Sequence, residues 1–411
     1  MLTREENELL TRTGRGTAMG ALMRRYWVPA LFSHRIAAPD GPPARVKLMG
    51  ERLVAFRDTE GRVGMLAEAC PHRTASLFFG RNEECGLRCI YHGWKFDVDG
   101  NCVDMPSEPP GSNFKHKVKA TAYPCIERGG LVWTYMGAPD RKPEFPDLEW
   151  AHLPEDRRFV TRHIQECNWL QGVEGGFDTS HLAFLHKGTE SEAQRPPERY
   201  QVVTIAAGFA AGSDGAIFRN ERRFTTSMFL MPFHKLIPTR PLGAHAWVPI
   251  DDENTMLYSV YFNPERALDD EDMRRARNFE HIHPENIPGT ERARANKDND
   301  YLIDRELQAS GKSFTGIYGV GLQDCGIQES MGRIADRTVE HLGVSDTAII
   351  KLRRYLLDVL AAVNAGSEPP GLEPASARMR VLRQHPGGDL SFAEAVEQFG
   401  RVGSTAEAAA E

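Results

Sequence analysis

Residues 70–94 read CPHRTASLFFGRNEECGLRCIYHGW, and this stretch sets the structure expected for the first third of the chain. It contains Cys70-Pro71-His72 and, after sixteen intervening residues, Cys89-Ile90-Tyr91-His92. Each half offers one thiolate and one imidazole on a tight loop. Two such loops that face each other can hold a small metal centre.

The mixed pairing of ligands favours an iron–sulfur cluster. In a Rieske [2Fe-2S] cluster two Cys hold one iron and two His hold the other, so each loop supplies one ligand to each iron. Tetrahedral zinc is the alternative, but zinc frameworks usually pair like ligands within each half. Cys85 could replace a ligand in a zinc site. We expect it to be a packed thiol instead, because its use would leave Cys70 or Cys89 without a role.

The residues around these loops are typical of a small all-β unit. Short β-prone runs begin near Arg45 and are separated by turn residues. Hairpin turns are expected at 58–61, 99–101 and 128–130, where Asp, Asn and Gly cluster. We therefore predict an all-β domain over residues 45–140, followed by a proline-rich linker over 141–155.

The remainder predicts a larger domain of the α+β class, built on an antiparallel sheet over residues 156–402. A helical stretch near 165–180 precedes long β-prone segments, and Asp346 or Ser345 can cap a late helix. Residues 1–44 are expected to be a helical segment that packs on this larger domain. The last nine residues, 403–411, are expected to form a flexible tail.

Composition excludes several classes of partner. The 411 residues include 50 Lys and Arg against 57 Asp and Glu, with a pI near 6.1, so no basic footprint for nucleic acid or anionic membrane is present. No signal-peptide pattern and no run of eighteen apolar residues occurs, which favours a cytoplasmic location. Seven thinly spread cysteines do not suggest a secreted disulfide framework.

A second group of potential ligands lies in residues 167–186, CNWLQGVEGGFDTSHLAFLH. Asp178 and His181 share a helical face, whereas His181 and His186 would lie about 140° apart on a regular helix. Both histidines can bind one ion only if the helix ends or unwinds between them, and nearby glycines favour that. Two His and one carboxylate form the site of non-haem Fe(II) oxygenases. A Rieske centre could supply the single electrons that such an iron needs.

Both motifs together resemble those of the Rieske non-haem iron aromatic-ring hydroxylating oxygenases. The resemblance covers nearly the whole chain and is greatest to the phthalate dioxygenase-like branch, whose oxygenase components contain α subunits only. It implies a helix-grip type catalytic domain. It also implies a third iron ligand in a D-x4-E context, which Asp324 and Glu329 match. Asp336 and Asp346 are competitors, but we expect Asp336 to pair with Arg337 and Asp346 to cap a helix.

The resemblance also implies partners and a reaction. A separate NAD(P)H-dependent reductase would pass electrons to the [2Fe-2S] cluster and then to mononuclear Fe(II), across the subunits of a head-to-tail homotrimer or a hexamer. Asp178 matches the residue that bridges His181 and a cluster histidine of the next subunit, here His92. The reaction implied is hydroxylation of an aromatic carboxylate with O2. Oxidative O-demethylation of a methoxylated aromatic acid is the alternative.

Substrate contacts are expected on the sheet between His186 and Asp324. A cation for a substrate carboxylate could come from Arg219, Arg222, Arg223, His234, Lys235 or Arg240, and Arg219 and His234 are the candidates chosen from this set. A non-catalytic zinc protein would have no use for the second ligand group. A Rieske electron carrier would leave some 260 residues unexplained. The glycines at 14, 16 and 20 imitate a dinucleotide fingerprint, but no strand precedes them, so no nicotinamide site is expected.

Overall fold

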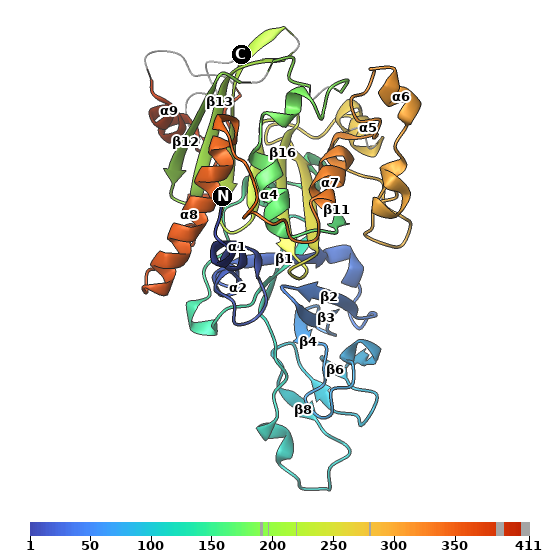
Figure 1. Cartoon of the computed structure of the whole chain (residues 1–411). Coiled ribbons are helices and arrows are strands. Elements are labelled where there is room, and N and C mark those ends of the chain that lie inside the picture. Colours follow the sequence, from blue (N-terminus) through green and yellow to red (C-terminus); the bar gives the residue numbers. More distant parts are fainter. Residues whose placement is uncertain (190–191, 196, 219, 279–280, 384–389, 404–411) are drawn as a thin grey trace.

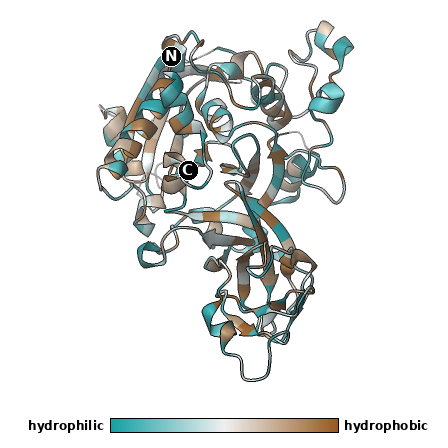
Figure 2. Cartoon of the chain, turned by 60° about the horizontal axis from the view of Figure 1, so that its bottom comes forward, coloured by the Kyte–Doolittle hydropathy of each residue, from teal (hydrophilic) through white to brown (hydrophobic). Residues whose placement is uncertain are grey.

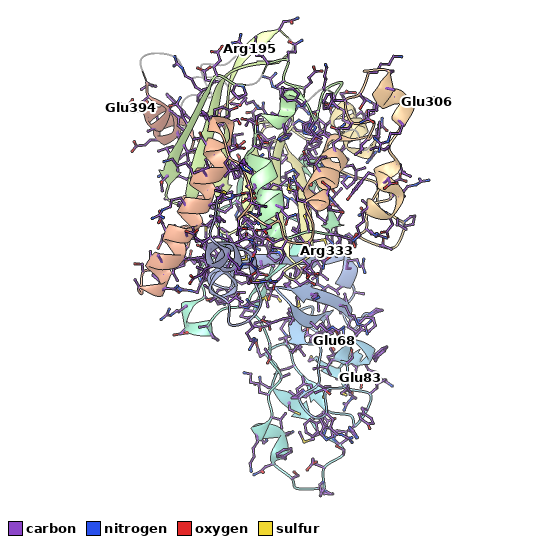
Figure 3. The ribbon with its side chains drawn as sticks, in the orientation of Figure 1. Glu68, Glu83, Arg195, Glu306, Arg333 and Glu394 are labelled. Carbon is purple, nitrogen blue, oxygen red and sulfur yellow. The ribbon has the colours of Figure 1, made fainter. Side chains whose placement is uncertain are left out.

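The computed structural model describes residues 1–189, 192–195, 197–218, 220–278, 281–383 and 390–403. Figure 1 shows a small lobe, coloured blue to cyan, that protrudes from a larger lobe of sheet and helices. Hydrophobic segments lie in the central strands of the larger lobe, and hydrophilic segments lie on its outer helices (Figure 2). Charged side chains such as Arg195, Glu306 and Glu394 are exposed at the periphery (Figure 3).

The small lobe is all-β, as predicted. Its first antiparallel sheet has the order β2-β3-β4, with β2 (Ala44–Leu48), β3 (Glu51–Arg57) and β4 (Val63–Ala67). The second has the order β5-β6-β7-β8, with β5 (Arg81–Glu83), β6 (Gly86–Arg88), β7 (Lys95–Phe96) and β8 (Cys102–Asp104). The predicted turns are confirmed. Asp58 Oδ1, for example, accepts hydrogen bonds from the backbone of Glu60 and Arg62 between β3 and β4.

A third sheet joins the N-terminal segment to the end of the small lobe. Its order is β1-β10-β9, with β1 (Trp27–Phe32), β10 (Leu131–Tyr135) and β9 (Cys125–Arg128). Residues 1–44 do contain the helices α1 (Arg4–Thr11) and α2 (Ala18–Met23), which contact the larger lobe. The strand β1 was not predicted, because its partner β10 lies about a hundred residues further along the chain.

The larger lobe is built on a seven-stranded antiparallel sheet, which confirms the α+β prediction. The strands, in spatial order, are β11 (Arg158–Gln165), β17 (Thr255–Phe262), β16 (Leu242–Pro249), β15 (His234–Ile237), β14 (Glu221–Leu230), β13 (Gly208–Phe218) and β12 (Arg199–Ile205). One face packs on the β1-β10-β9 sheet, where Trp133 contacts His234. The other face is covered by α4 (Trp169–Phe177), α7 (Val320–Ser330) and α8 (Thr347–Asn364).

The remaining helices are short and peripheral. They are α3 (Glu149–His152), α5 (Asp270–Arg277), α6 (Arg305–Ala309) and α9 (Phe392–Phe399). Among the described residues, every helix is too short or too polar to span a bilayer. Asp346 stands at the N-cap position of α8, but its carboxylate accepts from Gly343 N at 2.7 Å and makes no cap hydrogen bond to α8.

Helix α4 lies unusually close to the sheet because its glycines remove side chains from the contact. A Cβ atom at Gly172 would lie 2.2 Å from Trp247 Cδ1, and one at Gly176 would lie 2.7 Å from Trp247 Cη2. Larger residues at either position would therefore push the helix away from β16. The same glycines that weaken the helix allow its C-terminal end to lie directly on the sheet.

A buried ion network fixes α4 to the C-terminal part of the chain. The Glu174 carboxylate accepts hydrogen bonds from Arg337 Nη2 at 2.8 Å and from Arg353 Nε at 2.6 Å. Arg353 in turn pairs with Glu340. Burial opposes ionisation of Glu174, but the two guanidinium groups hold the pKa of this carboxyl below its usual value. Removal of one partner would leave an uncompensated buried charge, at a cost of about 3–5 kcal/mol.

Candidate metal centres

The two predicted cluster loops have the same backbone design. In the first, Cys70 N donates to Ala75 O at 2.8 Å, and Thr74 N donates to Cys70 O at 2.9 Å. In the second, Cys89 N donates to Trp94 O at 2.8 Å, and Gly93 N donates to Cys89 O at 2.9 Å. Thr74 and Gly93 both have positive φ, which closes each loop tightly. Each loop thus presents a cysteine and a histidine on the same side of its turn.

The four side chains converge with thiols inside and imidazoles outside. Cys70 and Cys89 are 1% and 3% exposed, whereas His72 and His92 are partly exposed. The two imidazole rings lie with their centroids 4.5 Å apart, and His72 stacks on Trp94 at 4.2 Å. Burial raises the pKa of Cys70 to about 11, and the neighbouring Cys89 adds to the shift. The Cys70 thiol would ionise only beside a cation, and the donor set of two buried thiols and two partly exposed imidazoles fits a [2Fe-2S] cluster.

Cys85 does not join this group. It lies in the turn between β5 and β6, where its backbone N–H donates to Thr59 Oγ1 at 2.8 Å. Its thiol is near the carboxylates of Asp58 and Glu60. Asp58 is already hydrogen-bonded to Arg62 and to the backbone of its own turn. The structure thus places the half-buried Cys85 against the β3–β4 turn.

The second group forms where α4 ends. The helix stops at Phe177, Asp178 is its C-cap residue, and His181 begins a short 3-10 turn before the chain reaches His186. This interruption is the one that the spacing of the two histidines required. Asp178 Oδ1 accepts from Ser180 N at 2.8 Å and from Ser180 Oγ at 2.5 Å, which holds the chain in its new direction.

Asp324 from α7 completes the group. His181 Nε2 and His186 Nε2 are 3.2 Å apart, and Asp324 Oδ1 lies 3.5 Å from the first and 3.3 Å from the second. Bonds of about 2.1 Å that meet at right angles place their donor atoms about 3.0 Å apart. The three donors therefore need to move only slightly to bind one ion on one face. This donor set fits the 2-His-1-carboxylate site of non-haem iron.

The outer nitrogen of each histidine has its own partner. His181 Nδ1 lies 3.5 Å from Asp178 Oδ2, and His186 Nδ1 donates to Gln323 Oε1 at 2.8 Å. Both Nε2 atoms are thereby turned toward Asp324, as ligand orientation requires. Sequence reasoning missed Gln323. The sequence offered one hint, since Gln323 is a polar residue directly before the proposed ligand Asp324. In the structure Gln323 is 1% exposed.

Charge is balanced within the group. Burial alone would lower the pKa of His186 and raise that of Asp324, but their contact reverses both shifts. Burial would also raise the pKa of Asp178, yet its hydrogen bond to His181 lowers that pKa to about 2. The two aspartates are therefore ionised at neutral pH and can neutralise a bound cation.

Other residues of the second motif anchor the N-terminal segment. Asn168 caps α4, and its Nδ2 donates to Thr11 O at 2.9 Å, while Trp169 Nε1 donates to Leu10 O at 3.1 Å. One expectation was wrong. Arg337 pairs with the buried Glu174, whereas Asp336 accepts from Thr338 on the surface.

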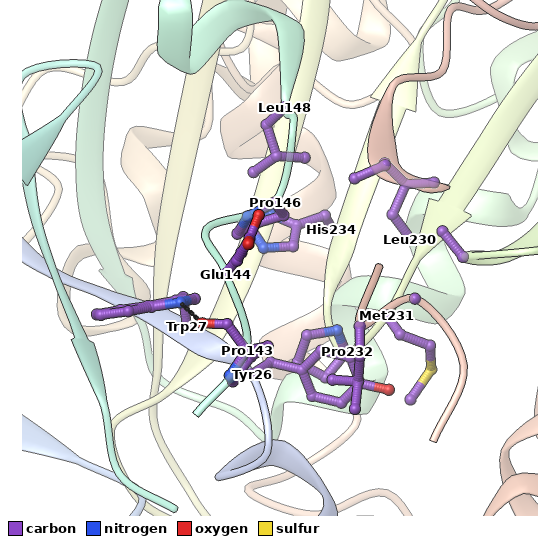
Figure 4. A pocket seen from close by; sticks show the side chains of 14 residues that line it. Tyr26, Trp27, Pro143, Glu144, Pro146, Leu148, Leu230, Met231, Pro232 and His234 are labelled. Atoms are coloured by element: carbon purple, nitrogen blue, oxygen red, sulfur yellow. Dashed lines mark hydrogen bonds between the residues drawn. The ribbon is translucent and has the colours of Figure 1, made fainter. Parts of the chain in front are cut away.

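Of the two expected substrate residues, His234 is not brought together with this group. Arg219 lies outside the described residues. His234 lies on the opposite face of the sheet, where its ring packs near Trp133 and lines a cavity with Tyr26 and Met231 (Figure 4). That cavity has a volume of about 20 Å³, enough for little more than one water molecule. The placement of His234 therefore does not support a contact with an aromatic acid at the iron site.

A Rieske-type domain joined to a 2-His-1-carboxylate site defines a class, the terminal oxygenases of multi-component systems. The family model described as "Rieske [2Fe-2S] domain" matches residues 26–124, and that described as "LigXa C-terminal domain like" matches residues 134–197 and 219–383. The chain belongs to the Rieske non-haem iron aromatic-ring hydroxylating oxygenases, in their phthalate dioxygenase-like branch. It is an oxidoreductase that incorporates O2 and works with a separate electron-transfer partner.

Individual relatives cover nearly the whole chain. The 3-chlorobenzoate-3,4-dioxygenase oxygenase subunit of Comamonas testosteroni is 40% identical over 91% of this chain and 93% of its own. The phthalate 4,5-dioxygenase oxygenase subunit of Pseudomonas putida is 41% identical over 93% and 91%. A solved structure, the reduced complex between oxygenase and ferredoxin in carbazole 1,9a-dioxygenase, has the same fold. Its TM-score is 0.60 at 20% identity, over 89% of this chain and 98% of that chain.

Proposed function

We propose that this chain hydroxylates an aromatic carboxylate at an iron held by His181, His186 and Asp324. The observation that carries the proposal is the convergence of three donor atoms within 3.2–3.5 Å of one another. Cys70, Cys89 and their paired histidines would hold the [2Fe-2S] cluster. When bound, the cluster supplies single electrons and the iron activates O2.

The chain's own residues would orient and shield this site. Gln323 accepts the Nδ1 proton of His186, and Asp178 lies against Nδ1 of His181, so the two rings keep one tautomer and one direction. Phe177 and Trp247 pack beside the end of α4 and exclude water from that side. The side-chain surface of Asp324 is 31% exposed, which leaves an open side for substrate.

Electron transfer between subunits is the second part of the proposal. The cluster lobe protrudes from the sheet lobe (Figure 1), so that it is available to a neighbouring copy. We infer a head-to-tail homotrimer, alone or paired as a hexamer, in which Asp178 of one chain meets His92 of the next. The electron donor would be a separate NAD(P)H-dependent reductase. Sedimentation of the purified protein tests the assembly, and a monomer that turns over at full rate would exclude this route.

Turnover with labelled oxygen tests the reaction. The holoenzyme is supplied with a surrogate reductase, NADH, ¹⁸O2 and a panel of benzoates, phthalates and methoxybenzoates. Incorporation of ¹⁸O into a ring hydroxyl or cis-diol is expected. Release of formaldehyde would assign the alternative O-demethylase activity. A metal-replete enzyme that consumes NADH and releases only peroxide with every aromatic acid would overturn the proposed substrate class.

A further inference from the structure

Three consecutive residues shortly before α6 have left-handed backbone. Asp300, Tyr301 and Leu302 have φ angles of 51°, 54° and 52°. None of them is glycine, and L-residues normally enter this region singly, because their Cβ atom approaches the following carbonyl oxygen. The side chains of Asp300 and Leu302 are exposed, whereas the ring of Tyr301 packs into the lobe. The strained turn therefore serves to place one side chain, that of Tyr301.

Tyr301 contacts α7, the helix that carries Gln323 and Asp324. Its hydroxyl donates to Glu329 Oε2 at 2.5 Å. A Cβ atom at Gly326 would lie 3.4 Å from Cγ and Cδ2 of Tyr301, so the ring lies directly on the backbone of the helix. Each residue of an α-helix turns by about 100°, which puts Gly326 about 200° around α7 from Asp324. Tyr301 therefore supports α7 from the side opposite the proposed iron ligand.

That side of α7 is not closely packed. A cavity of about 10 Å³ lies there, and its walls include Ile164, Leu322, Cys325 and Glu329 as well as Tyr301. The other oxygen of Glu329, Oε1, accepts from Glu166 N, directly after β11, at 3.0 Å. Glu329 is thus held by two donors, one from the sheet and one from Tyr301. Without the Tyr301 hydroxyl, α7 has room to turn toward the cavity.

We propose that Tyr301 is a positioning residue for the iron site, which fixes the rotation of α7 through Glu329 and Gly326. The inference rests on the proposed function, because Asp324 is the ligand that α7 brings to the iron. The carboxylate of Asp324 lies roughly 5–6 Å from the helix axis, so a rotation of about 10° moves it by about 1 Å. Functional groups need to be held within about 0.5 Å of their working positions. Tyr301 consequently keeps the Asp324 carboxylate within reach of both histidines.

Substitution of Tyr301 by phenylalanine in the full-length holoenzyme tests this role. Tyr301→Phe keeps the ring and the turn but removes the hydrogen bond to Glu329. Tyr123→Phe is the matched control, because Tyr123 donates to the carboxylate of Glu51 at 2.6 Å, away from α7. Anaerobic titration of iron-depleted protein against a competing Fe(II) chelator should show about tenfold weaker Fe(II) binding in Tyr301→Phe. Tyr123→Phe should bind Fe(II) as wild type does.

The nitric oxide complex of the ferrous site separates positioning from a general loss of stability. Its electron paramagnetic resonance spectrum reports the symmetry of the protein ligands around the iron. Tyr301→Phe should broaden or split this spectrum even at saturating Fe(II), because Asp324 no longer has one position. The midpoint of unfolding in urea should fall by similar amounts in Tyr301→Phe and Tyr123→Phe. In a Glu329→Met background, Tyr301→Phe should cause no further loss of Fe(II) affinity, since Tyr301 acts through Glu329.

The positioning role is overturned if Tyr301→Phe has the Fe(II) affinity or the Fe(II)–nitric oxide spectrum of an iron-loaded wild type. It is overturned equally if Tyr123→Phe weakens Fe(II) binding by the same factor, or if Tyr301→Phe weakens it further in the Glu329→Met background. Each of these outcomes leaves the proposed function intact. A wild-type protein that binds no Fe(II) at all would refute the iron site, and with it both proposals.

Discussion

Replacing Gln323 with leucine tests the iron assignment most directly. Gln323 Oε1 accepts the Nδ1 proton of His186 at 2.8 Å, and Gln323 Nε2 donates to Ile317 O at 2.9 Å. Gln323→Leu leaves both partners buried without a hydrogen bond, at about 1–3 kcal/mol each. The unpaired carbonyl of Ile317 costs free energy whether or not metal is bound, so it lowers the free energy of unfolding but cancels from the free energy of Fe(II) binding. The His186 penalty applies when the ring is fixed by iron. It predicts about 5- to 150-fold weaker Fe(II) binding.

Anaerobic titration of iron-depleted protein against a competing Fe(II) chelator measures this change, with Rieske absorption as the measure of intact protein. Gln323→Glu keeps the acceptor for His186 and should bind iron more tightly than Gln323→Leu does. Gln328→Leu is the matched control, because Gln328 is also buried on α7 but bonds to Gln165. The reasoning fails if Gln323→Leu binds Fe(II) as wild type does. It fails equally if Gln328→Leu weakens Fe(II) binding by the same factor as Gln323→Leu.

Three further outcomes are expected. Asp178→Ala should keep both metal centres, because Asp178 is not a ligand, yet lose turnover; a metal-replete variant with full product formation would contradict its bridging role. Cys89→Ala should lose the visible Rieske absorption, whereas Cys85→Ala should keep it, and the reverse result would reinstate Cys85 as a ligand. Burial lowers the pKa of His234 to about 3, so this residue takes up a proton in the unfolded chain below pH 6.5 and contributes about 2 kcal/mol to the stability that is lost between pH 8 and pH 5. Urea unfolding of His234→Phe should show a loss about 2 kcal/mol smaller than that of wild type, and an unchanged pH dependence would show that His234 is protonated in the fold.

Local signals account for the parts of the fold that the sequence predicted. The turn residues at 58–61 and 128–130 fix hairpins whose strands are neighbours in sequence, and Asp346 stands at the position where α8 begins. The strand β1 depends instead on pairing between Trp27 and Tyr135. Pairing between strands so far apart in the chain leaves no local pattern in the sequence. Residues 17–23, TAMGALM, just before β1 do favour a helix, so the predicted helical segment was continued through β1.

In the candidate site, too, local signals predicted some features and packing between distant segments decided others. The spacing of Asp178, His181 and His186 required a helix end, which the structure contains. The expectation for His234 depended on strand parity, because successive residues of a strand point to opposite faces and the sequence does not say which face carries the candidate iron ligands. His234 therefore fell on the face of Trp133, while Lys235, one residue later, fell on the face of α4, where its Nζ donates to Gly176 O.

The two histidines are held by partners of different origin, and this links metal binding to the packing of the lobe. Asp178 is local, and its carboxylate lies near His181 as soon as the turn after α4 forms. Gln323 and Asp324 arrive together on α7, and they fix His186 and complete the donor set only when that helix packs on α4. Residues 178–186 alone thus supply the two histidine donors, but the His186 ring lacks its hydrogen bond to Gln323 until α7 packs on α4. The buried Arg337 and Arg353 hold Glu174 of α4 to the chain that follows α7 and should consequently stabilise the proposed iron site, although their ion pairs are with Glu174 and not with its proposed ligands.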